Sequence, residues 1–589
     1  MPRKSKSRSP NPRSKTNGSQ NGSHNGYARG TTAYDDMSSS LLEHRRKHAS
    51  LDTPDSATAT AHLMSRSSFT LDETPPSLPT PGPGSAGASK GFFELPEQDR
   101  RNFLLLVLLY FLQGIPMGLA AGSVPFLLKQ HLSYSQIGIY SLASYPYSLK
   151  LLWSPIVDAV WSRKVGRRKS WILPIQTLSG FAMLWLGARA ESMMTSAGKG
   201  DGSGVWAFTG WWFGLVFMCA TQDIAVDGWA LTLLSPSNLS YASTAQTVGL
   251  TAGQFLSNTV FLALSSNDFA NKWFRTAPLD TGLITLGGYL SFWGYAYLIV
   301  TLGLAVLKRE ERSREKDGIL EVYRVMGGIL KLKNIQTFIV IHLIAKIGFQ
   351  ANDAATNLKL IDKGFSREDL ALTVLIDFPF EISLGYYAGK WSERYSPMRL
   401  WCWAFVGRLA AAAFAQLTVM FFPGDARTAG LGVGYFGLII VEHVFSTFMS
   451  TVMFVAVSAF HAKIADPEIG GTYMTLLATV SNLGGTFPRF FILKFVDLFT
   501  VATCAPPTSP PKDLAKLKGD PVTAPFSCVA EAEKHRCESG GGTCGISTDG
   551  YYIVNMLCIL VGVLTFWGFI KPAALRLQAL PLRAWRGAG

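Results

Sequence analysis

The chain has 589 residues, of which 48% are hydrophobic and only 16% charged, and its mean hydropathy is +0.20. Soluble domains carry about 25% charged residues, so this chain has too little charge to solvate a globular surface. These values exclude a soluble enzyme, a fibrous protein and a disulfide-rich secreted domain. The net charge of +14 lies largely in the N-terminal tail and in short loops, and no platform of aromatic and basic residues indicates nucleic-acid binding.

The N-terminal segment 1–98 differs in composition from the rest of the chain. It is rich in Ser, Pro, Gly, Asn and Arg and has no long apolar stretch. Such a composition cannot bury enough apolar surface to offset the entropy lost on ordering, so we predict a disordered cytosolic tail. Because the first 20 residues also lack the apolar core of a cleavable signal peptide, the first apolar helix is predicted to direct membrane insertion.

Apolar segments of about 20 residues, the length that crosses a bilayer, recur through the remaining chain. Six precede a charged stretch, KREERSREKD at 308–317: 103–128, 136–160, 171–188, 206–234, 241–264 and 283–307. Six follow it: 336–358, 369–388, 398–422, 431–460, 470–499 and 551–570. We therefore predict an all-α membrane protein with twelve transmembrane helices in two six-helix bundles. The predicted parts after the tail are the bundle 99–307, a cytosolic linker 308–334, the bundle 335–571 and a cytosolic tail 572–589.

Basic loops predict the orientation. The loop 163–169, RKVGRRK, has five cations and no acid, and the linker and the C-terminal tail are also basic. By the positive-inside rule these segments and both termini face the cytosol. The loop 501–550 then lies on the other side of the membrane.

That non-cytosolic loop holds four of the seven cysteines, namely Cys504, Cys528, Cys537 and Cys544. Four cysteines in such a position favour two disulfides in an oxidising compartment, with three connectivities open. The alternative is zinc binding, which lacks the closely spaced Cys or His pairs it needs, so no metal site is predicted.

Acidic residues inside the spans are functional hypotheses, because a charge in hydrocarbon is costly. Asp223 and Asp227 lie one helical turn apart in ATQDIAVDGWA and share a face. Two nearby carboxylates in a low dielectric tend to share a proton, so we predict proton coupling here. The same role is predicted for three later acids, Asp353, Asp377 and Glu381. The alternative is that these acids pair with basic residues and lock helices together.

Cations and aromatic side chains in the spans are candidates for holding an anionic substrate. Lys150, in SLKLLWSPIVDAVW, either meets the substrate or neutralises the aspartates of the fourth span. Lys346, Phe349 and Asp353 fall near one helical face. The substrate-binding candidates are Lys150, Lys346, Arg408, Arg489, Tyr147, Trp153 and Phe349. Structural ion pairs and plain packing are the alternatives for each of them.

The basic loop and the first span suggest mechanical roles. We predict a gating clamp at the loop between the second and third spans. Its residues are Asp158, which precedes the loop, and Gly166, Arg167 and Arg168, which lie in it. A GxxxGxxxG ridge at 114–122 favours close packing between helices over a phosphate cradle. No catalytic constellation and no cofactor motif is found, so neither an enzyme nor a cofactor is predicted.

Two sets of six spans, a charged linker and a basic loop after the second span resemble the major facilitator superfamily. Its loop signature is present in part: Asp158 and GRRK at 166–169 occur at a wider spacing, and Ser154 stands where the first glycine is usual. Longer stretches are similar to the acetyl-coenzyme A transporter family of the endoplasmic reticulum. These stretches are LQGIPMGLAAGSVPFLL (112–128), SLKLLWSPIVDAVW (148–161), GRRKSW (166–171), ATQDIAVDGWALTLL (220–234), AKIGF (345–349), IGGTYMTLLATVSNLGG (469–485) and DGYY (549–552).

The resemblance implies transport of acetyl-CoA from the cytosol into the lumen of the endoplasmic reticulum, where it supplies acetylation. Alternating access of the two bundles at a midplane site would perform the transport. The expected partners are acetyl-CoA and the lipid bilayer, and a homodimer is left open. Three alternatives remain: a proton-coupled transporter of another organic anion, peptide-like or sugar-conjugate as in muropeptide permeases, a membrane acyltransferase, and a scaffold or sensor that transports nothing.

Overall fold

The computed structural model describes residues 95–129, 131–197, 203–235, 238, 240–310, 319–423, 432–464, 470–507 and 520–585. The predicted tail 1–98 therefore lies almost wholly outside the described residues. Helical segments occupy all twelve predicted spans, which confirms the helical membrane fold. Within the described residues, eight helices are long and apolar enough to cross a membrane. In the other four, 3-10 turns interrupt 136–160 and 336–358, and polar residues are more frequent in 369–388 and 470–499.

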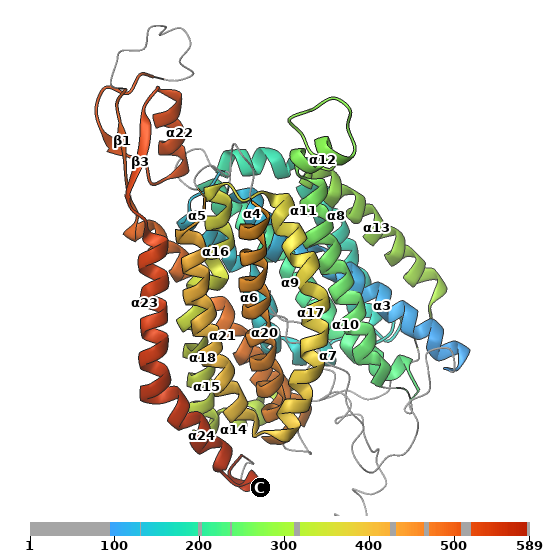
Figure 1. The fold of residues 1–589 in the computed structure, drawn as a ribbon. Helices are drawn as coiled ribbons and strands as arrows, with labels where there is room; N and C mark the ends of the chain where they lie inside the picture. The colour runs from blue at the N-terminus through green and yellow to red at the C-terminus, as the bar shows by residue number, and fades with distance from the viewer. Residues whose placement is uncertain are drawn as a thin grey trace, which may run out of the picture. The chain divides into compact units, whose positions relative to one another are not determined.

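The N-terminal bundle extends from α3 to α13 (Figure 1). Its helices are α3 (Glu97–Gly118), α4 (Val124–Leu128), α5 (Tyr134–Ser141), α6 (Tyr145–Leu149), α7 (Ser154–Ala159), α8 (Lys169–Ala197), α9 (Ser203–Leu233), α10 (Ser240–Phe255), α11 (Phe261–Leu264), α12 (Asn267–Trp273) and α13 (Leu286–Leu307). Pro146 and Pro155 stand in the first turns of α6 and α7, where the N–H that proline lacks has no partner to lose. The second span is therefore a series of short helices instead of one rod.

The C-terminal bundle follows the linker helix α14 (Ile319–Leu330). Its helices are α15 (Lys333–Ala345), α16 (Gln350–Lys363), α17 (Arg367–Arg394), α18 (Pro397–Met420), α20 (Val433–Ile464), α21 (Gly470–Phe499), α23 (Gly550–Thr565) and α24 (Lys571–Ala579). The predicted tail 572–589 packs on this bundle over most of its length, because Trp585 is fully buried against Phe338 and Phe460. Residues 586–589 lie outside the described part of the chain.

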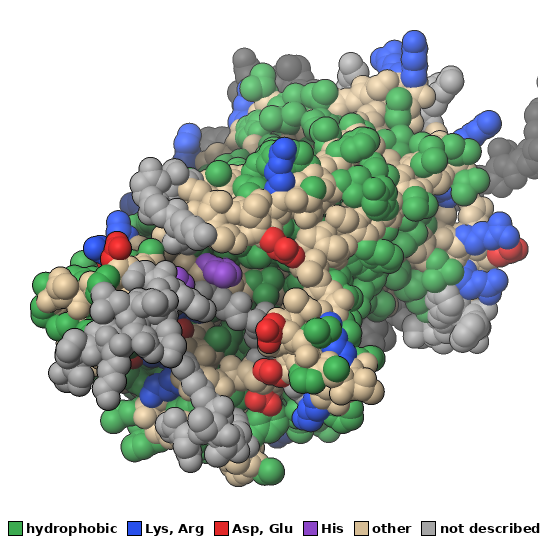
Figure 2. All heavy atoms as spheres, turned by 90° about the horizontal axis from the view of Figure 1, so that it is seen from above, with side chains coloured by type: hydrophobic (Ala, Val, Ile, Leu, Met, Phe, Trp, Pro, Cys, Tyr) green, Lys and Arg blue, Asp and Glu red, His purple; other side chains and the backbone are tan. Residues whose placement is uncertain are grey.

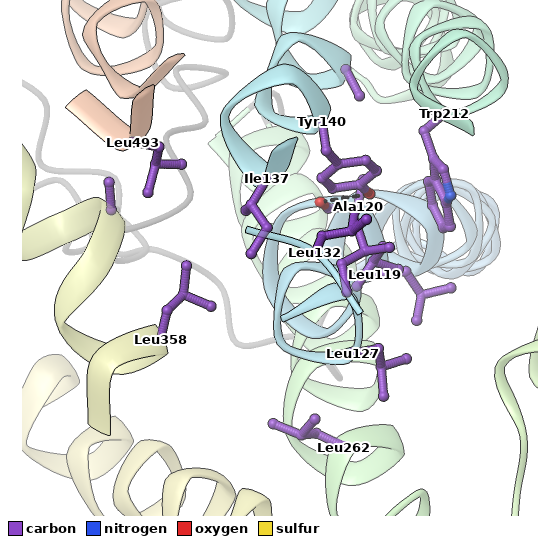
Figure 3. Packing of buried hydrophobic residues seen from close by; sticks show 14 of the residues in the cluster. Leu119, Ala120, Leu127, Leu132, Ile137, Tyr140, Trp212, Leu262, Leu358 and Leu493 are labelled. Carbon is purple, nitrogen blue, oxygen red and sulfur yellow. Dashed lines mark hydrogen bonds between the residues drawn. The ribbon is translucent and has the colours of Figure 1, made fainter. Parts of the chain in front are cut away.

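The largest hydrophobic core includes side chains from both bundles. Ile137 and Tyr140 of α5 belong to the same buried cluster as Leu358 of α16 and Leu493 of α21 (Figure 3). The hydroxyl of Tyr140 donates to the carbonyl oxygen of Ala120 at 3.0 Å, so its one polar atom is also satisfied. Because α5 packs closely against α21, this core joins the two halves of the molecule.

Large apolar side chains also cover the outer face. On α13 and α23 the exposed ones include Phe292, Ile299, Leu302, Leu560 and Leu564. Seen from the end that bears the β-strands, hydrophobic side chains form broad areas and charged ones gather in patches between them (Figure 2). An apolar outer face is stable where lipid chains surround the protein instead of water.

The 501–550 loop forms a small sheet of strand order β2-β1-β3, all pairs antiparallel, built from β1 (Val501–Ala505), β2 (Phe526–Ser527) and β3 (Thr543–Thr548). Together with α22 (Glu531–Ser539) it lies at the end of the bundles opposite to α14 and α24 (Figure 1). Disulfides join Cys504 to Cys537 and Cys528 to Cys544. The described parts of the loop, 501–507 and 520–550, thus form a cross-linked unit outside the helical bundles.

Glycines let α3 and α10 pack backbone against backbone. A Cβ atom at Gly114 would lie 2.5 Å from the carbonyl oxygen of Leu250. One at Gly253 would lie 2.2 Å from the carbonyl oxygen of Phe111. A backbone neighbour cannot move aside as a flexible side chain can, so these positions need glycine. The structure thus places the GxxxGxxxG ridge at a helix–helix contact.

Replacing Gly253 by leucine is therefore expected to force α3 and α10 apart and to lower the free energy of unfolding by about 3 kcal/mol or more. Gly303 on α13 is the matched control, because a Cβ atom there meets nothing within 4 Å. Thermal unfolding in detergent, followed by size-exclusion chromatography, compares the Gly253→Leu and Gly303→Leu proteins. Equal melting temperatures would contradict the close contact.

Candidate functional site

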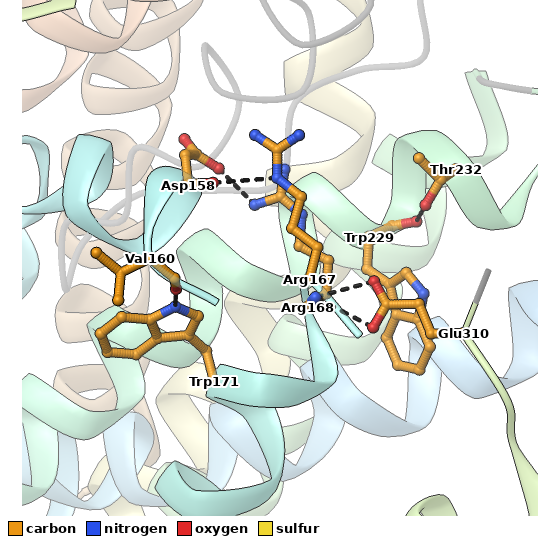
Figure 4. Close-up of polar contacts among 8 residues, drawn as sticks. All are labelled: Asp158, Val160, Arg167, Arg168, Trp171, Trp229, Thr232 and Glu310. Carbon is orange, nitrogen blue, oxygen red and sulfur yellow. Dashed lines mark hydrogen bonds and ion pairs between the residues drawn. The ribbon is translucent and has the colours of Figure 1, made fainter. Parts of the chain in front are cut away.

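The predicted clamp residues meet at the end of the molecule that bears α7 (Figure 4). Arg168 forms an ion pair with Asp158, and Nε of Arg167 donates to the carbonyl oxygen of Asp158 at 3.1 Å. Gly166 adopts φ 116°, a left-handed conformation that glycine tolerates best, and so allows the sharp turn between the arginines and α7. The structure therefore brings together all four residues predicted for the clamp.

Two further residues complete this clamp. Glu310 of the linker accepts hydrogen bonds from the backbone N–H groups of Arg168 and Lys169, each at 2.9 Å (Figure 4). Gly228 of α9 leaves space for the Arg168 guanidinium, since a Cβ atom there would lie 2.2 Å from its Cζ. The clamp thus ties the basic loop to α7, to α9 and to the start of the linker.

A second group of candidates is buried inside the N-terminal bundle. Lys150 forms an ion pair with Asp223, which is fully buried and also accepts a hydrogen bond from Gln113 at 2.6 Å. Asp227 accepts hydrogen bonds from Tyr110 at 2.6 Å and from Gln246 at 3.0 Å. Both aspartates thus have partners from other helices, as a carboxylate in the membrane interior requires.

Two predicted aromatic residues belong to this buried group. The ammonium of Lys150 lies 4.8 Å from the centre of the Tyr147 ring, and Trp153 donates to Thr221 at 3.1 Å. Two cavities between the helices are described below, and neither Lys150 nor the two aspartates are among their described lining residues. This part of the predicted site is therefore a packed polar network and is separate from the cavities.

A cavity between the helices brings together the other substrate-binding candidates. The charged side chains among its described lining residues are Lys346, Arg408, Arg489 and Asp353. Lys346 and Phe349 lie on a 3-10 turn, Lys346–Phe349, that interrupts the seventh span and allows both side chains to face this space. With three cations and one carboxylate, the described wall of this cavity carries a net positive charge.

Arg408 is the centre of this cavity wall. It is 2% exposed, forms an ion pair with Asp353 and donates to the hydroxyl of Ser446. Its guanidinium lies 4.8 Å from the centre of the Phe349 ring, a favourable cation–π geometry. Arg489 of α21 donates to the backbone carbonyl oxygen of Asp353 at 3.3 Å, so both arginines contact the same residue, Arg408 at its carboxylate and Arg489 at its main chain.

A second, larger cavity shares Asp353, Arg408 and Arg489 with the first. It is lined by parts of both bundles and adds Asp377, Glu442 and His443. Asp377 accepts a hydrogen bond from Thr447 at 2.7 Å and faces Nδ1 of His443 at 3.2 Å. Two predicted proton-coupling residues, Asp353 and Asp377, thus lie on its wall, whereas the side chain of Glu381 lies outside the described part of the structure.

Polar contacts tie the two bundles together at the end that bears the β-strands. Lys129 of the N-terminal bundle forms an ion pair with Asp362 of α16 at 2.9 Å, and Tyr134 donates to the same carboxylate at 2.7 Å. The backbone N–H of Ser135 donates to Asp497 of α21 at 2.6 Å. These contacts must break if the bundles separate at this end.

Reversing one charge of this pair is expected to favour separation. Lys129→Asp would place two carboxylates together and shift the equilibrium toward the open form by about 2 kcal/mol, roughly thirtyfold in population. The readout is the labelling rate of a cysteine at Ser144, which lines both cavities, by an impermeant maleimide added on the side of the 501–550 loop. The double variant Lys129→Asp/Asp362→Lys should restore the slow rate. Unchanged labelling in Lys129→Asp would show that the pair does not hold this end shut.

Several residues of these networks carry weak sequence signals. Gln113 interrupts an apolar run, which is a usable signal for a buried polar role, but Glu310 lies within a charged stretch where nothing distinguishes it. His342 and His461 are buried with their Nε2 atoms 3.1 Å apart, although 119 positions separate them in the chain. Contacts over such separations come from helix packing, which the sequence pattern does not encode locally.

Comparisons with known proteins show the family and the fold of this chain. A family model described as acetyl-coenzyme A transporter 1 matches residues 102–317, 310–400 and 394–587. An uncharacterized membrane protein of Saccharomyces cerevisiae is 44% identical over 565 residues, covering 84% of this chain and 98% of its own. An anhydromuropeptide permease of Escherichia coli is 26% identical over 220 residues, covering 36% of this chain and 38% of the permease. The crystal structure of the nucleoside transporter NupG superposes with a TM-score of 0.51 at 12% identity, covering 80% of this chain and 99% of NupG, a likeness of fold alone.

Proposed function

Because this chain belongs to the acetyl-coenzyme A transporter family, we propose that it carries acetyl-CoA from the cytosol into the lumen of the endoplasmic reticulum by alternating access. The protein is a multi-pass membrane transporter with the fold of the major facilitator superfamily. Beyond this fold and class, we propose its substrate, the membrane in which it lies and the direction of transport.

The observation that carries the proposal is the cationic cavity around Arg408. Acetyl-CoA carries several phosphate charges and an adenine ring, so its site should offer cations and aromatic faces. Lys346, Arg408 and Arg489 supply the cations, and Phe349 and Trp401 line the same space. The cavity also lies at the contact of the two bundles, where Ser141 and Ser144 of the N-terminal bundle join its wall. A site at this contact can be exposed to either side as the bundles rock.

The direction rests on the two ends of the molecule. The basic loop 163–169, the linker and α24 belong on the cytosolic side by the positive-inside rule, which also makes both termini cytosolic. The loop 501–550, with its Cys504–Cys537 and Cys528–Cys544 disulfides, lies at the opposite end and suits an oxidising lumen.

Uptake of labelled acetyl-CoA into sealed proteoliposomes tests the proposal. We expect saturable uptake that excess unlabelled acetyl-CoA blocks, with an affinity for acetyl-CoA that falls about tenfold in Lys346→Ala because one charge-assisted hydrogen bond is lost. Lys331→Ala is the matched control, because Lys331 is an exposed lysine in the turn before α15 and lines neither cavity. Well-folded protein that takes up no acetyl-CoA in either direction would refute the substrate while leaving the fold in place.

Proton coupling is the remaining part of the proposal, and Asp227 offers its clearest test. This carboxylate is almost fully buried, one turn from Asp223, and accepts hydrogen bonds from two neutral donors. Two close carboxylates favour binding of one proton between them. Asp227→Asn is therefore expected to remove the stimulation of uptake by an imposed pH gradient, as measured in the same proteoliposomes. Normal uptake with a normal response to the gradient would exclude Asp227 as the coupling residue.

A second candidate substrate is a peptide-like or sugar-conjugate organic anion. The acids Asp377 and Glu442 in the larger cavity favour this candidate, because a zwitterion would place its ammonium there and its carboxylate against the arginines. The muropeptide permease among the relatives makes the same class worth testing. A competition panel of peptides, sugar conjugates and nucleotides against labelled acetyl-CoA would separate the two substrates.

A further inference from the structure

The two cavities differ in the chemistry of their walls. The smaller one has Lys346 beside the shared arginines, with Phe349 and Trp401 for an aromatic ring. The larger one adds Asp377 and Glu442. Phosphate groups are attracted to the first wall and repelled by the acids of the second, so a ligand that is anionic at one end only has a preferred orientation.

Three residues that line the larger cavity each have a buried polar atom without a protein partner among the described residues. They are Nε2 of Gln254, Oγ1 of Thr259 and Oδ1 of Asp377. Asp377 and Thr259 are each 6% exposed, and a buried polar atom left without a hydrogen bond costs free energy. A ligand with amide, hydroxyl and carbonyl groups would satisfy donors and acceptors of this kind.

Resting on the proposed function, we propose that an acyl-CoA lies across both cavities in one orientation. Its adenine and 3′-phosphate occupy the cavity with Lys346, and its diphosphate lies at the shared arginines, Arg408 and Arg489. Its acyl-pantetheine arm, with its amides and thioester, extends into the larger cavity past Gln254. The nucleotide end and the acyl end are thus recognised by different residues.

Competition by two halves of the substrate tests this orientation. Uptake of labelled acetyl-CoA is measured in proteoliposomes with adenosine 3′,5′-bisphosphate or S-acetylpantetheine as the competitor. Loss of one charge-assisted hydrogen bond corresponds to about tenfold in affinity. Lys346→Met should therefore raise the inhibition constant of the bisphosphate about tenfold and leave that of S-acetylpantetheine unchanged, whereas Gln254→Met should do the reverse.

Controls keep the outcomes distinct. Lys346→Arg should retain inhibition by the bisphosphate, and Gln336→Met, at an exposed glutamine on α15, should change neither constant. If each variant changed the inhibition constants of both competitors equally, or if Lys346→Met affected only S-acetylpantetheine and Gln254→Met only the bisphosphate, the orientation would be wrong. Acetyl-CoA transport itself would stand. No uptake of acetyl-CoA by the unmodified protein would overturn the proposed function and the orientation with it.

Discussion

Replacing Arg408 by methionine is expected to reduce acetyl-CoA uptake to less than about one-tenth, because a charge-assisted bond to a phosphate contributes about 1.5–3 kcal/mol. The same change should lower the free energy of unfolding by about 3–5 kcal/mol, since it removes one member of the buried ion pair between Arg408 and Asp353. Both quantities are measured on the purified protein, by uptake in proteoliposomes and by unfolding in detergent.

A double variant separates the two roles of Arg408. In Arg408→Met/Asp353→Asn the negative charge that Arg408 neutralised is removed as well, so most of the lost stability should return. Uptake should stay low, because the cation that faces the substrate is still missing from both cavities. If uptake returned together with stability, Arg408 would be a structural residue only and the cationic cavity would lose its central argument.

Replacing Lys150 by methionine is expected to cost about 3–5 kcal/mol of stability, the usual effect of removing one partner from a buried ion pair. Asp223 is fully buried and would keep the hydrogen bond from Gln113 but lose its ion pair with the lysine. Unfolding in detergent measures the loss, with Lys331→Met as the exposed-lysine control. Lys150→Met/Asp223→Asn should recover most of the stability.

The outcome also decides what the buried network does in transport. A Lys150→Met protein as stable as the unmodified one would mean that Asp223 is neutral in the folded state and does not need the lysine. A destabilised single variant and a stable double variant that still transports would identify the pair as a structural lock of α9. In both cases Lys150 lies outside the described walls of the two cavities.

The residues of the candidate site can be identified from the sequence, because charged residues in a membrane segment are energetically costly. Their arrangement in space cannot. Charged residues are rare in membrane segments and are easily recognised there. The examples in this chain are Lys150, Asp223, Lys346, Asp353 and Arg408. In the folded structure, Lys150 and Asp223 form an ion-paired network within the N-terminal bundle. Lys346, Asp353 and Arg408 line a cavity at the contact of the two bundles. Which cation meets which acid depends on the rotation and the breaks of helices far apart in the chain.

Local breaks in the helices show the same limit. The prolines of the second span predict interruptions, and proline occupies the first turns of α6 and α7. The spacing of Lys346 and Phe349 predicts a shared face, but the 3-10 turn at Lys346–Phe349 contains no proline, so nothing in its residue types predicts the break in the helix. Packing against Gly562 and Leu409, which would lie 2.8 Å and 3.0 Å from a Cβ atom at Gly348, accommodates this turn.

The sequence by itself determined the membrane class, the twelve spans in two sets of six and the family, because hydropathy over 20 residues and long shared stretches are local properties of the chain. Only the tertiary structure decided that Arg408 and Arg489 meet at Asp353, that Lys150 is held by Asp223 and that Glu310 closes the clamp. It also paired Cys504 with Cys537, where the sequence left three connectivities open. These contacts join residues tens to hundreds of positions apart, and their formation depends on close packing between helices, which no local pattern specifies.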